Sequence, residues 1–193
     1  AFVFNNTNEK SSWKRITASI SVNRITSFDQ RSSINGAGKN SISDYFLYYA
    51  DGIPLEDIQI YDDETISDIY GYLGEETGFD AQQAFLGYQS YIIDPLTNNL
   101  SERSYVSNIN SDRFNHILNQ FNEGYHRKTS FNFSGLYKDF LHLGFNINQH
   151  RIEFSNFQDF YEKDHDSNSL VSNVNFENSL LSLGQGFSLQ FGA

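Results

Sequence analysis

The sequence predicts an all-β fold, in which about five antiparallel strands form part of a transmembrane β-barrel and a long, partly helical insert forms an outer loop. Several stretches alternate between apolar and small polar residues, a pattern that gives a strand two different faces. The apolar faces carry no charge for about ten residues, which is the length of one transmembrane strand. The connections alternate between short turns and long loops, as they do in outer-membrane barrels.

The clearest pair of strands lies at 127–151, where a tight turn at Lys138-Asp139 joins two alternating segments. One face of this pair is aliphatic or aromatic. The other face is built from Ser, Asn, Gly and His, with few of the Lys and Glu residues that usually cover a soluble sheet. We therefore expect the apolar face to contact lipid and the polar face to line the lumen of a barrel. The residues expected to line the lumen are Arg15, Ser19, Asn23, Asn132, His142, Asn146 and Gln190.

The same pattern predicts the remaining strands. Residues 1–5 resemble the end of a strand, and 13–27 and 180–193 alternate between aliphatic or aromatic residues and small polar ones. Trp13 and Tyr137 both lie next to short turns. Aromatic residues at such a common level are typical of an interfacial girdle, although ordinary hairpin aromatics give the same pattern.

Residues 28–126 interrupt the strand pattern and are predicted to fold as an extracellular cap, because a structureless loop of that length would be unusual. Residues 29–40 read as a polar loop, and residues 152–175 as a second, shorter outer loop. Apolar residues at helical spacing, with capping residues before them, predict the helices of the cap. These helices are expected at 41–50, 63–73, 80–87 and 112–122.

The cap is rich in apolar and aromatic residues between 45 and 93. Two interpretations are open. Either these residues form the core of the cap and nothing else, or they form a core together with an exposed groove that binds an apolar ligand. The residues expected to bind such a ligand are Phe46, Tyr49, Ile53, Leu55, Tyr70, Leu73, Phe79 and Phe85.

The composition excludes several classes of function. The formal net charge of −11 argues against a nucleic-acid partner, which requires a basic surface. The chain has neither cysteine nor methionine, and both ends are expected to be cuts inside a longer chain. Gly36–Ser41 lacks the residues of a phosphate-binding loop, and Asp164–Asn175 lacks those of a calcium loop. We therefore expect no enzyme activity, cofactor or metal site.

Five stretches resemble the FadL/TodX family of Gram-negative outer-membrane transport proteins, including its hemin-receptor-like branch. The stretches are AFVFNNTNEKSSWKRITASISVN, SISDYFLYYADGIPL, AFLGYQSYIIDP, SFNFSGLYKDFLHLGFNIN and GFSLQFGA. This resemblance implies a closed barrel in the outer membrane, a plug, and outer loops that capture hydrophobic molecules such as fatty acids. The Asn-Pro-Ala motif of the family's plug is not in this chain, so the plug and the closing strands would come from the rest of the protein.

Two other functions are compatible with the same residues. One is a secreted, soluble, β-rich module that binds carbohydrate or another ligand, and the other is a structural or adhesive outer-membrane protein. A soluble sandwich should bury Leu141, Leu143, Phe145 and Ile147 against a second sheet, whereas a barrel should leave them without protein contacts.

Overall fold

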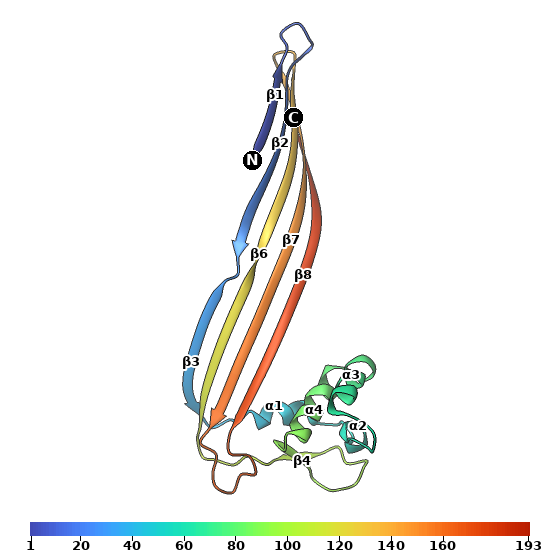
Figure 1. Cartoon of the computed structure of the whole chain (residues 1–193), viewed down its shortest axis with the longest axis vertical. Coiled ribbons are helices and arrows are strands. Elements are labelled where there is room, and N and C mark those ends of the chain that lie inside the picture. The colour runs from blue at the N-terminus through green and yellow to red at the C-terminus, as the bar shows by residue number, and fades with distance from the viewer. The chain divides into compact units, whose positions relative to one another are not determined.

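The computed structural model describes residues 1–193, of which 53% lie in strands and 18% in helices. Six strands form one antiparallel sheet, in the order β1-β2-β6-β7-β8, with β3 also paired to β6 (Figure 1). The antiparallel, mostly β fold predicted from the sequence is confirmed, and the sheet is open. The strands of this sheet are β1 (Phe2–Thr7), β2 (Trp13–Ser27), β3 (Gln30–Gly38), β6 (Phe114–Tyr137), β7 (Leu141–Lys163) and β8 (Val174–Gly192).

The strand β3 corrects one prediction, because residues 29–40 were expected to be a loop. β2 ends at Ser27, and β3 begins three residues later and pairs with the same neighbour, β6. The break is fixed by Asp29, whose carboxylate accepts hydrogen bonds from the Ser27 hydroxyl and the Gly124 N–H. These two bonds hold the pKa of Asp29 below its usual value of 3.8. Gly124 has φ +133°, a conformation that side chains rarely adopt.

The prediction of a helix at 112–122 is also wrong, because β6 begins at Phe114. The apolar residues in this segment fit a 3–4 spacing, but pairing with β3 and β7 decides the structure instead. β7 likewise extends to Lys163, so the second loop comprises residues 164–173 and not 152–175. The insert between β3 and β6 is accordingly residues 39–113, shorter than the predicted 28–126.

The insert contains four helices and a small hairpin. Thr65 caps one helix by accepting a hydrogen bond from the N–H of Asp68. The positions before the other helices are Ile42, Pro54 and Gly78, and none of them forms a side-chain capping hydrogen bond. The elements are α1 (Ser43–Ala50), α2 (Leu55–Ile58), α3 (Ile66–Glu76), α4 (Phe79–Gln89), β4 (Ile93–Pro95) and β5 (Tyr105–Ser107).

The chain divides into two compact units. Unit 1 contains residues 1–32, 120–158 and 178–193, and unit 2 contains 33–119 and 159–177. In unit 1 the two short turns lie at the same end of the sheet (Figure 1), where the Lys138 N–H donates to the Ser12 carbonyl at 2.6 Å. Unit 2 holds all the helices, and its buried apolar residues form the hydrophobic core. None of these helices has the length and hydrophobicity that crossing a membrane requires.

Candidate functional site

Four of the residues expected to bind an apolar ligand form the core of unit 2. Phe46, Leu55, Leu73 and Phe85 are each at most 3% exposed, and Phe46 packs edge-on against Phe176. Their side chains therefore stabilise the helical insert and offer almost no surface to a ligand. Apolar residues at helical spacing are core residues in many proteins, and here the core interpretation fits these four positions.

The other four predicted ligand residues are more accessible. Tyr49 and Phe79 contact each other edge-on, with ring centroids 5.4 Å apart, and Tyr48 extends this row at 5.1 Å from Tyr49. Phe79 is 55% exposed. Ile53 and Tyr70 are half-buried beside the core. The structure thus brings Tyr49 and Phe79 together in a partly exposed aromatic row.

A hollow of about 300 Å³ opens in unit 2 between α4 and the loop that precedes β8. Its volume is at the lower limit of small-molecule binding sites. Phe46 is the only predicted ligand residue that lines this hollow. The other lining residues were not predicted, because spacing along the sequence does not show that residues 171–176 fold against α4. Its apolar lining is Phe46, Leu86, Ile92, Val171, Val174 and Phe176.

A buried carboxylate in unit 2 was not predicted from the sequence. Glu162 has no exposed surface and has four hydrogen-bond partners, two at each oxygen. The Ser41 hydroxyl donates to it at 2.6 Å and the Ile42 N–H at 2.8 Å, and the Nε2 atoms of His116 and His165 lie 2.9 Å and 3.1 Å from its oxygens. This cluster joins the start of α1 to β6 and β7.

His165 has a hydrogen-bond partner at each ring nitrogen. Its Nδ1 atom lies 2.6 Å from the Val171 carbonyl, and its Nε2 atom faces Glu162. A carbonyl can only accept a hydrogen bond, so Nδ1 of His165 carries a proton and donates it to Val171. Through these two contacts His165 also ties the loop between β7 and β8 to Glu162. Residues from four segments of the chain meet around Glu162 and His165, and for this reason no local motif indicated the cluster.

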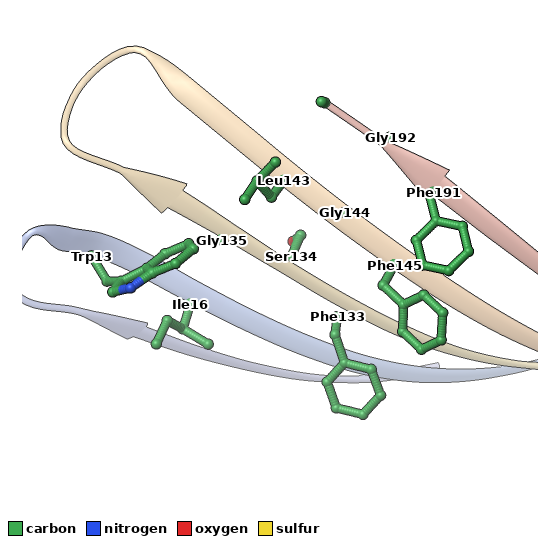
Figure 2. Close-up of a pocket in the computed structure, with 11 residues that line it drawn as sticks. Trp13, Ile16, Phe133, Ser134, Gly135, Leu143, Gly144, Phe145, Phe191 and Gly192 are labelled. Atoms are coloured by element: carbon green, nitrogen blue, oxygen red, sulfur yellow. The ribbon is translucent and has the colours of Figure 1, made fainter.

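One face of unit 1 is apolar and has no other element packed on it. Ile16, Val22, Phe133 and Leu143 are each at least 40% exposed. Figure 2 shows Phe133, Phe145 and Phe191 projecting from the same side of neighbouring strands, with Phe145 and Phe191 4.9 Å apart. A shallow apolar hollow of about 700 Å³ lies on this face near the short turns.

Trp13 and Tyr137 mark the end of this apolar face at the short turns. They are paired across β2 and β6, and their rings meet edge-on at 5.3 Å. The indole of Trp13 lies over Gly135, where an added Cβ would come within 2.7 Å of the ring (Figure 2). The glycine therefore makes room for the tryptophan, and the pair is a cross-strand aromatic contact beside the short turns.

The opposite face of unit 1 holds the residues expected to line a lumen. Arg15 and His142 lie around one hollow of about 310 Å³ near the short turns. Ser19 is paired with Asn132, and Asn23 with Lys128. Further along, the side-chain amide of Asn146 donates to Gln190 at 3.0 Å. All seven predicted residues thus lie in unit 1, although they do not converge on one point.

A chain of polar contacts crosses β6, β7 and β8 on this face. The Ser130 hydroxyl donates to Asn148 at 2.6 Å, and the Asn148 amide donates to Ser188 at 3.1 Å. Ser188 also contacts Nε2 of His150, whose Nδ1 lies 3.0 Å from Nε2 of His126. Asn148 is 1% exposed, so the polar face is structured and not merely hydrated.

No family model, curated protein or solved structure matches this chain.

Proposed function

We propose that this chain is part of an outer-membrane β-barrel that transports hydrophobic small molecules, such as fatty acids, as its resemblance to the FadL/TodX family implies. The observation that supports this most is the uncovered apolar face of unit 1. A soluble protein rarely exposes a continuous apolar patch of more than a few hundred Å². No second sheet packs on this face, as a sandwich would require.

The dimensions of the apolar face fit a bilayer. It runs along β7 from Leu141, beside the Trp13–Tyr137 pair, to Arg151, where charged residues begin. About ten residues at roughly 3.3 Å per residue give a length of about 33 Å. A strand tilt of about 40° reduces this to a height of roughly 25 Å, which is the height of the apolar band of outer-membrane barrels.

Insertion in a bilayer requires that the sheet be closed. β1, β3 and β8 each pair with one strand only, and unpaired backbone groups on these edges would each cost several kcal/mol in hydrocarbon. We propose that the remaining strands of the same protein pair with these edges. The polar face, with Arg15, His142 and the Ser130–Asn148–Ser188 chain, would then face the lumen.

Capture of the transported molecule is assigned to unit 2. Its hollow has apolar walls from Leu86, Ile92, Val171 and Phe176, and burial of apolar ligand surface there would contribute roughly 25 cal/mol per Å². The partly exposed row of Tyr48, Tyr49 and Phe79 offers a second apolar surface.

The first experiment is gel mobility of the intact protein in detergent, with and without boiling. A folded outer-membrane barrel remains compact in cold detergent and shifts on boiling, whereas solubility without detergent and no shift would support the secreted binding module. Binding of a fluorescent fatty acid then separates transport from a structural or adhesive role. Val171→Trp, which fills the hollow, should weaken that binding, and Val106→Trp outside it should not.

A further inference from the structure

Three arginines form a row across unit 1 on the same side as the apolar face. Arg24 on β2 is the direct partner of Arg127 on β6. The contacts Ser130–Asn148 and Tyr125–Glu153 set the register of β6 and β7, and they place Arg151 opposite Arg127. Because successive residues alternate between faces, all three side chains lie on the face of Val22, Phe131 and Ile147.

Such a row is costly without an anion, because like charges on directly opposed residues repel. The carboxylates nearby compensate only part of the charge. Arg24 lies 3.3 Å from Asp29, and Arg151 lies 3.8 Å from Glu153, but Arg127 forms no salt bridge. Arg127 instead lies over the ring of Tyr125, with its guanidinium carbon 4.7 Å from the ring centroid.

The guanidinium groups are exposed, although Nη2 of Arg24 already donates to Ser27, Asp29 and the Gly124 carbonyl. The side chains of Arg24 and Arg151 are 54% and 67% exposed, and Arg127 is also exposed. Arginine binds phosphate through two parallel N–H donors, so adjacent arginines suit a phosphate group. The row is a local concentration of positive charge in a chain whose formal net charge is −11.

The row lies where the apolar face ends. One level closer to the short turns the same face carries Val22 and Thr129, and the next level carries Ile20 and Phe131. A lipid with its acyl chains on these apolar residues would therefore place its headgroup beside the arginines. A free phosphate ion would gain nothing from the adjoining apolar surface.

We propose that Arg24, Arg127 and Arg151 bind the phosphate of an anionic lipid headgroup at the border of the apolar face. This inference rests on the proposed membrane location of the face. It adds a specific lipid contact at the end of the barrel opposite the short turns, separate from the hollow that is assigned to the transported molecule.

The test uses the intact protein in detergent micelles and native mass spectrometry with added phosphatidylglycerol or phosphatidylcholine. Arg127→Gln combined with Arg151→Gln should weaken phosphatidylglycerol binding at least tenfold, since each basic residue near an anionic surface contributes roughly a fivefold gain in affinity. The matched control combines Lys10→Gln with Lys128→Gln. It removes the same charge, from a short turn and from the opposite face, and should leave phosphatidylglycerol binding unchanged.

Three results would overturn the proposal: equal binding of the two lipids by the unmodified protein, equal losses in the two double variants, or displacement of phosphatidylglycerol by inorganic phosphate at similar concentration. The boiling-dependent gel shift is measured on the same samples. A protein that shows the shift but does not distinguish the lipids refutes only the lipid site. A protein that needs no detergent and shows no shift refutes the proposed function as well.

Discussion

Placing one charge on either face of β2 gives the sharpest test of the membrane orientation. Ala18 and Ser19 are neighbours in sequence, but Ala18 is paired with Phe133 on the apolar face and Ser19 with Asn132 on the polar face. Ala18 lies near the middle of the apolar band, about midway between the Trp13–Tyr137 pair and Arg24. Ala18→Arg should therefore cost about 2–4 kcal/mol of stability in a bilayer, the penalty for arginine at the midplane of a barrel.

The assay is urea unfolding of the intact protein in phospholipid vesicles. A penalty of about 2–4 kcal/mol corresponds to a roughly 30- to 700-fold change in the folding equilibrium. Val22→Arg lies one level from the arginine row and should cost only about 0–1 kcal/mol. Ser19→Arg, facing the lumen, should change stability by less than about 0.5 kcal/mol. Equal costs at Ala18 and Ser19, or at Ala18 and Val22, would refute the proposed orientation.

Three further changes test other parts of the structure. Gly124→Ala should lower the free energy of unfolding by about 1–3 kcal/mol, because Gly124 has φ +133° and an added Cβ would collide with the Glu153 carbonyl. The measurement is urea unfolding, and Gly36→Ala, at an open position, is the control. Glu162→Gln should cost about 1–3 kcal/mol and increase hydrogen exchange in residues 164–173, because the amide nitrogen cannot accept the hydrogen bonds that one carboxyl oxygen now receives. Exposed Asp166→Asn should do neither. Val171→Trp should reduce fatty-acid affinity about tenfold without lowering the melting temperature, since it fills a hollow; an unchanged affinity would remove the hollow as the capture site.

The sequence was sufficient for the strands whose two faces differ. The segments 13–27 and 141–151 alternate cleanly, and both are strands in the structure. The sequence was not sufficient at 29–40, where polar residues and glycines predicted a loop. It was also not sufficient at 112–122, where the spacing of apolar residues predicted a helix. These segments became strands because β6 pairs with β3 and β7, and long-range pairing can override local preference.

The predicted sites show the same limit. Helical spacing identified Phe46 and Phe85 as important, but spacing cannot distinguish a core residue from a ligand contact, and both are buried. Glu162 lies 46 residues from His116 and about 120 from Ser41 and Ile42, so only the fold brings these partners to the carboxylate. Short-range motifs cannot indicate such a cluster.

The polar face has a structural role that follows from the proposed location of the apolar face. In water, burial of an apolar face fixes the register of a sheet, because a slip of one residue would expose it. In lipid the same slip would turn the polar side chains toward the acyl chains, which is also costly. The contacts from Ser130 through Asn148 to Ser188 add to this constraint on how β6, β7 and β8 align, because a slip would break each of them. Short side chains that hydrogen-bond across strands accordingly predominate on that face, where Lys128 is one of the few long charged residues.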